Sequence, residues 1–267
     1  MKGTKTRARS TIAALLLLAL TALGCASLGY WQLERAEQRR DILRVMEQGR
    51  TSTPLSLVAN TATEELHDWR RVNAQGHCRN DLTVLLENRN HDGRPGYWVA
   101  TPLALSSEPE RAILVLRGWT PRRFAAPGDT GAPAHPPAGE LQAASGLQQI
   151  QGELLSRVPR MYELSSLSGQ ESGSLPAHIP DPASPLPIVV NLALDDYAAA
   201  TGLSLLPAII QQADDASQPD DGLVRLWGEP SVDADKNIGY AIQWFSFAAI
   251  ALGAFLVIVW RRLRRPR

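Results

Sequence analysis

Two long apolar stretches without a single charged residue dominate the pattern of the chain, one near each end. The first covers residues 11–33 and the second covers residues 238–260. A helix rises about 1.5 Å per residue, so about 20 apolar residues cross the hydrocarbon core of a membrane. The pattern therefore predicts two transmembrane helices, tails of residues 1–10 and 261–267, and one large segment of residues 34–237 between the helices.

The charged residues predict the orientation of these helices. The net charge is zero, but all 27 Asp and Glu residues lie from Glu34 to Asp235. The only charged residues of the two tails are Lys and Arg. Basic flanks of membrane spans stay in the cytoplasm. The sequence therefore predicts a multi-pass protein of the cell inner membrane, with both termini cytoplasmic and the acidic segment periplasmic. The membrane lipid is one expected partner.

The first apolar stretch has two alternative interpretations. Its basic start, the apolar run Ile12–Leu23 and the small residues that follow resemble a cleaved signal peptide, and Cys25 could end a lipoprotein signal. Both alternatives leave unexplained why the uncharged run continues to Leu33. An uncleaved membrane anchor is the preferred interpretation.

The segment between the stretches begins with helical spacing and then turns to strand patterns. Residues 31–49 keep an apolar stripe, which predicts that the first helix continues out of the membrane. His91-Asp92-Gly93 predicts a turn, and residues 194–200 predict a short helix. Strands are predicted at Trp69–Gln75, Leu82–Glu87, Tyr97–Leu105, Ala112–Arg117, Leu147–Leu154, Ile188–Leu192 and Leu223–Trp227. We expect a mostly β periplasmic domain, as a small sheet or open barrel with a membrane-proximal helix.

Three stretches interrupt these strands. Residues 124–145 are rich in Ala, Pro and Gly, residues 165–187 are rich in Ser and Pro, and residues 211–221 are acidic and polar. None has periodic apolar content, so all three are predicted to be exposed loops.

Known catalytic and metal-binding patterns are not found in the sequence. The five histidines show no metal-ligand spacing, and the motifs of hydrolases, zinc proteases and phosphate-binding loops do not occur. Cys25 lies in the first apolar stretch and Cys78 in the central segment, so no disulfide is expected between them. The acidic segment would repel nucleic acid. These observations favour a protein that is not an enzyme, holds no metal site and does not bind nucleic acid.

Four segments carry a resemblance to a known family. They are LGYWQLER at residues 28–35, NRNHDGRPGYWVATPL at 88–103, LVLRGWTPR at 114–122 and YAIQWF at 240–245. Their order, spacing and position relative to the two apolar stretches resemble the Surfeit-locus family of cytochrome c oxidase assembly factors, in a bacterial-type form.

The resemblance implies a role in the biogenesis of the respiratory chain. A member of this family is expected to assist, like a chaperone, the insertion of haem a into the catalytic subunit of the oxidase, or its stabilisation there. Subunit I of cytochrome c oxidase and haem a synthase are the partners that it implies. A membrane-anchored periplasmic binding or sensor module, unrelated to the oxidase, is the alternative.

The resemblance also implies a haem-facing surface, formed by Trp31, Asn237, Tyr240 and Trp244. The family's usual pattern places a His, the favoured iron ligand, where this chain has Asn237. An amide does not replace an imidazole as an axial ligand of ordinary strength. We therefore expect weak or transient binding of haem a. The structural alternative is that Asn237 caps the N-terminus of the second helix.

Small residues at a spacing of four occur in both apolar stretches, at Ala22 and Ala26 and at Ala249 and Gly253. Such spacing lets helices approach closely in a membrane. We expect the two helices to pack against each other and to bring Trp31 and Tyr240 together.

Overall fold

The computed structural model describes residues 2–123, 136–161, 175–181, 186–216, 220–228 and 233–264. The chain divides into two compact units, each of which is described by itself. The helical unit comprises residues 1–44 and 230–267, and the β unit comprises residues 45–229. A mostly β domain between two apolar helices agrees with the fold class that the sequence predicted.

Two helices form the helical unit, α1 (Lys2–Thr51), of which residues 2–44 belong to it, and α3 (Ala234–Leu263). Both are long and apolar enough to cross a membrane, and only 11% of the most apolar window of each is buried. Their apolar side chains therefore face the surroundings, unlike those of a core helix in a water-soluble protein. Helix α1 runs on through polar residues to Thr51, as its spacing predicted.

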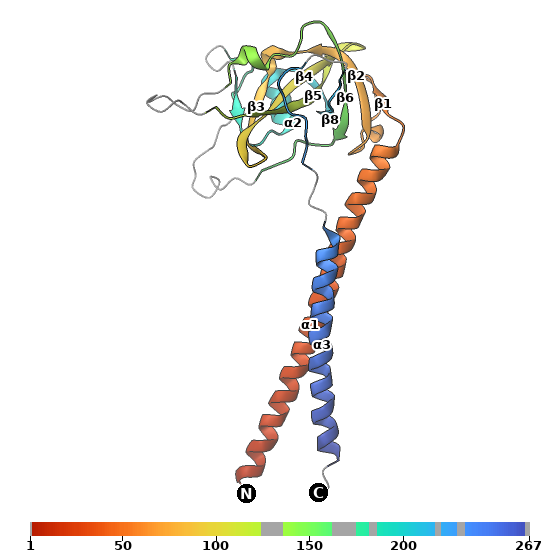
Figure 1. The fold of residues 1–267 in the computed structure, drawn as a ribbon, viewed down its shortest axis with the longest axis vertical. Coiled ribbons are helices and arrows are strands. Elements are labelled where there is room, and N and C mark those ends of the chain that lie inside the picture. The colour runs from red at the N-terminus through yellow and green to blue at the C-terminus, as the bar shows by residue number, and fades with distance from the viewer. Residues whose placement is uncertain are drawn as a thin grey trace, which may run out of the picture. The chain divides into compact units, whose positions relative to one another are not determined.

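The two helices of this unit lie side by side (Figure 1) and pack closely at one level. A Cβ atom on Gly29 would stand 2.8 Å from the ring of Phe245, so the ring packs closely against this glycine. The ring of Tyr30 meets Phe245 edge-on, with 5.4 Å between centroids. The prediction that the helices pack is confirmed. Of the small residues expected to mediate packing, Ala22, Ala26 and Ala249 line a shared hollow, but a Cβ atom added to Gly253 would meet no atom of the other helix within 4 Å.

The described residues of the β unit form eight strands and a short helix, besides the end of α1. They are β1 (Leu55–Leu57), β2 (Arg71–Cys78), β3 (Val84–His91), β4 (Arg94–Leu105), β5 (Glu108–Pro121), β6 (Leu147–Leu155), β7 (Ile188–Val189), α2 (Leu194–Thr201) and β8 (Ser204–Gln212). Short 3-10 helices occur at Thr63–Glu65, Asn80–Leu82 and Ala138–Leu141. The short helix predicted at residues 194–200 is confirmed.

The strands form one sheet in the order β1-β2-β6-β8-β5-β4-β3-β7, and β2 also pairs with β4. This extra pairing closes five strands, β2, β6, β8, β5 and β4, into a barrel, where the sequence suggested a small sheet or an open barrel. Gly76 pairs with Leu105 at the closure, and a Cβ atom on Gly76 would stand 2.1 Å from the carbonyl oxygen of Ala104. The closure therefore depends on a residue without a side chain.

The interior of the barrel is filled by alternate residues of its strands, as the pleat requires. Residues that face one another across the ladder, such as Ala74 and Ile150 or Val115 and Ile210, share this interior. The buried cluster also includes Val72, Leu103, Leu105, Ile113, Leu154, Leu206 and Ala208. A second apolar cluster packs under α2 and includes the fully buried Tyr197.

The turn predicted at His91-Asp92-Gly93 is confirmed as a two-residue hairpin between β3 and β4. His91 pairs with Arg94, while Asp92 and Gly93 have φ values of 48° and 73°. Positive φ at both central residues is the conformation that matches the twist of the flanking strands.

The strand predictions differ from the structure at three places, the first of which is strand β1, which was not predicted. Six of the predicted strands correspond to β2, β3, β4, β5, β6 and β7 with shifted ends, but residues 223–227 form only one bridge, from Val224 to Trp119. Strand β8 was not predicted. The predicted loop at 211–221 is wrong at its start, because Gln211 and Gln212 are buried in β8.

Much of the predicted loop sequence lies outside the described residues, namely 124–135, 165–174, 182–185 and 217–219. In the described part, residues 138–141 form a 3-10 helix whose Leu141 is buried, so this stretch is not entirely exposed.

Candidate functional site

Aromatic rings predicted to face haem a lie on the outside of the helical unit. The side chains of Trp31 and Tyr240 are 51% and 53% exposed. Trp244 is partly buried, and its ring meets Phe247 edge-on with 6.1 Å between centroids. Large rings that remain half exposed can contact a partner or a planar ligand without first leaving a packed core.

Asn237 has a different environment from these rings. It is 7% exposed, and its Nδ2 donates a hydrogen bond to Oε1 of Gln32 at 2.9 Å. The interpretation of Asn237 as a helix cap is wrong, since α3 begins at Ala234 and the cap is Asp233, which accepts from the backbone N–H of Lys236 at 3.3 Å. Asn237 is therefore a helix-to-helix contact residue.

The sequence predicted that Trp31 and Tyr240 lie together, but the contacts between the helices at this level are made by residues near them in the chain. Gln32 contacts Asn237, and Tyr30 contacts Phe245, while Trp31 and Tyr240 point more to the outside. Gln32 was missed in the sequence, although a polar residue near the end of an apolar stretch is itself a signal of an interhelical hydrogen bond.

The predicted haem-facing surface offers no imidazole. Residues 1–44 and 230–267 contain no histidine. His67, His77 and His178 are exposed on the β unit, and His91 stands against the ring of Trp119 at 5.2 Å between centroids; His135 lies outside the described residues. The residues present therefore do not fit histidine ligation of haem iron in the helical unit.

Two of the resembling segments, residues 88–103 and 114–122, build a tightly packed cluster in the β unit. The indole of Trp119 occupies the space where Gly96 would carry a Cβ atom, 2.4 Å away, and its Nε1 donates to the carbonyl oxygen of Arg89 at 2.7 Å. The guanidinium of Arg89 lies 4.3 Å from the ring centroid of Trp98 and donates to the carbonyl oxygen of Val190 at 3.1 Å. These characteristic residues thus hold β3, β4 and β5 together.

Arg89 of this cluster is buried, and among the described residues its guanidinium forms no ion pair with an acidic side chain. Burial lowers the pKa of Arg89 to about 10, because the charged form loses hydration. Its charge is still present at neutral pH, and the face of the Trp98 ring compensates part of the lost hydration.

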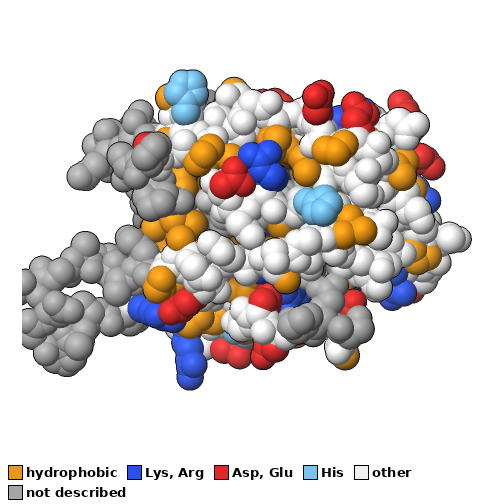
Figure 2. All heavy atoms as spheres, turned by 90° about the horizontal axis from the view of Figure 1, so that it is seen from above, with side chains coloured by type: hydrophobic (Ala, Val, Ile, Leu, Met, Phe, Trp, Pro, Cys, Tyr) orange, Lys and Arg blue, Asp and Glu red, His pale blue; other side chains and the backbone are white. Residues whose placement is uncertain are grey.

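The outer surface of the β unit carries mixed charges. On the face shown in Figure 2, acidic and basic side chains are interspersed with hydrophobic ones among the described residues.

Comparison with known proteins gives the family. The profile of the SURF1 family matches residues 19–249. A SURF1-like protein of Monosiga brevicollis is 25% identical over 249 residues, which cover 89% of this chain and 82% of that protein. An uncharacterized SURF1-like protein of Mycobacterium bovis is 27% identical over 268 residues, covering 95% and 86%.

A third relative matches a shorter region. The cytochrome oxidase assembly protein SHY1 of Saccharomyces cerevisiae is 28% identical over 102 residues, which cover 38% of this chain and 26% of the yeast protein. The family profile, in contrast, takes in the whole β unit and parts of both apolar helices. The chain therefore belongs to the SURF1 family.

Proposed function

We propose that this protein is an assembly factor for haem–copper cytochrome c oxidase, and that it assists the insertion of haem a into the catalytic subunit or its stabilisation there. The observation that carries the proposal is membership of the SURF1 family over residues 19–249. The name of the yeast relative, a cytochrome oxidase assembly protein, supports the same role.

The proposed location is the cell inner membrane, with both termini in the cytoplasm and the β unit in the periplasm. Two helices long and apolar enough to cross a membrane support the membrane location, and the basic tails support the orientation. In this arrangement Trp31 and Tyr240 would lie near the periplasmic boundary of the membrane, where amphipathic rings are favoured.

The proposed action is non-catalytic. The half-exposed rings of Trp31 and Tyr240 would contact subunit I of the oxidase, haem a synthase or the apolar faces of haem a during transfer. Binding through the porphyrin faces suits a transient carrier, because contact without an iron ligand is released easily. Asn237 would hold the two helices together and leave the iron unligated.

The test is a deletion of the gene, followed by complementation. We expect the deletion strain to contain less haem a in subunit I, and the wild-type gene to restore it. A double substitution of Trp31→Ala and Tyr240→Ala should restore it poorly, whereas Trp260→Ala, at the other end of α3, serves as the matched control. Unchanged oxidase spectra and activity in the deletion strain would overturn the proposed function.

Co-purification separates this role from a periplasmic sensor or binding module. Affinity purification of the tagged protein from membranes should recover subunit I of the oxidase or haem a synthase. Recovery of neither, from a strain that makes the oxidase, would favour the module unrelated to the oxidase.

A further inference from the structure

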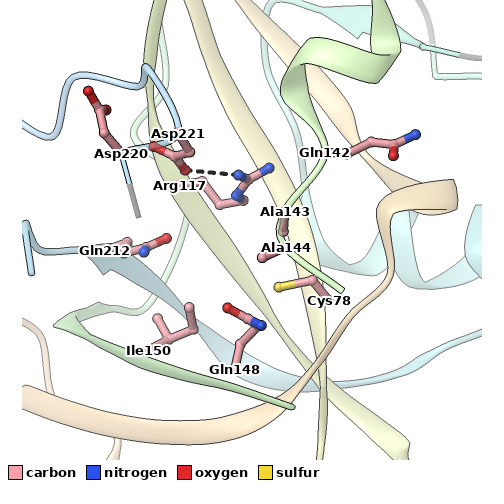
Figure 3. A pocket seen from close by; sticks show the side chains of 10 residues that line it. All are labelled: Cys78, Arg117, Gln142, Ala143, Ala144, Gln148, Ile150, Gln212, Asp220 and Asp221. Atoms are coloured by element: carbon pink, nitrogen blue, oxygen red, sulfur yellow. Dashed lines mark hydrogen bonds and ion pairs between the residues drawn. The ribbon is translucent and has the colours of Figure 1, made fainter. Parts of the chain in front are cut away.

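One end of the barrel contains a hollow of about 240 Å³ (Figure 3). Its walls include inward-facing residues of four barrel strands, Cys78 on β2, Arg117 on β5, Gln148 on β6 and Gln212 on β8. The pairing registers Gly76–Gln148 and Gly152–Gln212 place these side chains on the interior face. The apolar interior therefore ends in a polar mouth.

Gln212 places an unsatisfied hydrogen-bond acceptor in this mouth. Its side chain points into the hollow in Figure 3, it is 4% exposed, and its buried Oε1 has no hydrogen-bond partner. Buried polar atoms in folded proteins are paired with very few exceptions, because an unpaired acceptor loses its hydration without compensation. The unpaired side-chain carbonyl oxygen of Gln212 can therefore accept a hydrogen bond from a ligand.

The charges around this acceptor are unbalanced in favour of acid. Asp221 accepts hydrogen bonds from both nearby arginines, from Arg117 at 2.9 Å and from Arg225 at 2.6 Å. A neighbouring hollow of about 380 Å³ shares Gln212 and Asp220 with the first and adds Asp214 and Asp215. Asp214 also lies 3.7 Å from Arg225. The hollow itself is lined by two carboxylates, those of Asp220 and Asp221, and by the one guanidinium of Arg117, so its mouth favours cations.

The geometry favours an ammonium over a metal ion. Among the described residues, no three His, Cys, Asp or Glu side chains are grouped as a metal would require. A primary ammonium carries three N–H donors and needs fewer fixed ligands. It can donate to Oε1 of Gln212, while the carboxylates of Asp220 and Asp221 at the rim supply negative charge.

The rest of the hollow suits the carbon chain that such a group carries. Ile150 and the methyl groups of Ala143 and Ala144 line it beside the polar groups. Burial raises the pKa of the Cys78 thiol, which therefore stays uncharged and adds to this less polar wall. We infer that the mouth of the barrel binds a primary amine, with its ammonium on Gln212 and its alkyl chain against Ile150.

Binding is tested on the full-length protein in detergent by calorimetric titration. The probes are n-butylamine, Nα-acetyl-lysine methylamide and, as the uncharged control, Nα-acetyl-norleucine methylamide. We expect saturable binding of at least one of the two amines and none of the norleucine derivative. Stronger binding of the lysine derivative would identify a polypeptide as the source of the amine, and equal binding would identify a small free amine.

Substitutions at Gln212 decide the assignment. Gln212→Leu should weaken amine binding about tenfold or more, and Gln212→Glu should strengthen it, because a carboxylate pairs better with an ammonium. Gln211→Leu is the matched control, since Gln211 is also buried but is the next residue of β8 and faces the opposite side. Binding that is absent for both amines, or that is indifferent to Gln212→Leu and Gln212→Glu, would overturn the inference.

Discussion

Asn237 donates a hydrogen bond to Gln32 at 2.9 Å and thereby joins the two apolar helices of the protein. The position at which the family's usual pattern has a histidine is thus occupied by a residue that is 7% exposed and turned toward the partner helix. Side-chain hydrogen bonds between membrane helices contribute about 0.6–2 kcal/mol. In this chain the position contributes to the association of the helices.

Cysteines at this contact should be joined by a short bifunctional thiol reagent. We expect Gln32→Cys with Asn237→Cys to cross-link efficiently in membranes, in a background carrying Cys25→Ser and Cys78→Ser. Gly239 is the control position, because a Cβ atom there would have no neighbour within 4 Å. Gel mobility of the proteolysed protein measures the yield, and equal yields for Gln32 paired with either position would contradict the helix contact.

Substitution Asn237→His should strengthen the binding of haem a. An imidazole restores the family's usual iron ligand at this position and can still donate to Gln32. The measurement is the haem content and absorption spectrum of the protein purified from a strain that makes haem a. Asn237→Gln is the control for a changed side chain without an imidazole. Tight stoichiometric haem in the unsubstituted protein, indifferent to both changes, would show that another residue ligates it.

Substitution Gly96→Ala should destabilise the β unit by about 1–3 kcal/mol or more, because an added methyl group overpacks a filled site. The Cβ atom would stand 2.3 Å from the carbonyl oxygen of Thr120 and 2.4 Å from the ring of Trp119. Thermal unfolding followed by tryptophan fluorescence measures the effect. Gly139→Ala is the matched control, since no atom lies within 4 Å of its Cβ position. Similar melting temperatures for both variants would contradict the close approach.

Substitution Tyr197→Phe should lower the stability of the β unit by about 1–3 kcal/mol, because it leaves a buried carbonyl oxygen without its donor. The phenol of Tyr197 is fully buried and donates to the carbonyl oxygen of Leu82, which ties α2 to the segment before β3. Tyr240→Phe, at an exposed site, should leave the melting temperature unchanged. A melting temperature of Tyr197→Phe equal to that of the unsubstituted protein would refute the importance of this bond.

Asp81 should make the stability of the β unit depend on pH in the acid range. The side-chain hydrogen bonds from Arg79, at 2.8 Å and 3.0 Å, lower the pKa of Asp81. A carboxyl group whose folded-state pKa is lowered stabilises the fold above its unfolded pKa of about 4, and this contribution is lost as the pH falls through the folded value. The melting temperatures of the unsubstituted protein and of Asp81→Asn should therefore differ at neutral pH and converge in acid. A constant difference down to the lowest pH would exclude this linkage.

The features that the sequence predicted correctly have strong local signals. An uncharged run of membrane-spanning length marks each apolar helix, and Asp92-Gly93 between two β-rich runs marks the hairpin. The end of a helix is signalled less clearly. Apolarity marks the expected membrane boundary, whereas α3 begins in the polar residues before it, so Asp233 and not Asn237 is the cap.

Strand β8 was missed because Pro207 stands in its middle, and proline is expected to end a strand. In the structure Leu205 pairs with Ala112 and Ile209 with Leu114, so Pro207 lies in an irregularity between the two registers. The pairing with β6 starts only at Ile209. Proline therefore removes no ladder hydrogen bond here. Strand β8 can be recognised only from its pairing partners, which a single sequence does not specify.

The hydrogen-bonding role of Asn237 and the orphaned acceptor of Gln212 depend on residues distant in the chain. Asn237 and Gln32 are 205 positions apart. Gln212 faces a mouth built from β2, β5 and β6, and the closure of the barrel at Gly76 determines that such a mouth exists. Local patterns do not specify the distant partners in either arrangement.

The position of β8 determines when the β unit can fold. It is the last of the described strands along the chain, yet it lies between β6 and β5 in the sheet. Until residues 204–212 are available, the facing edges of β5 and β6 remain open to other chains, and open edges are sites of aggregation. Pairings between distant segments also form slowly. A nascent chain therefore holds an incomplete ring until synthesis has passed Gln212, only a short distance before α3 begins, and a chain truncated before Ser204 should aggregate.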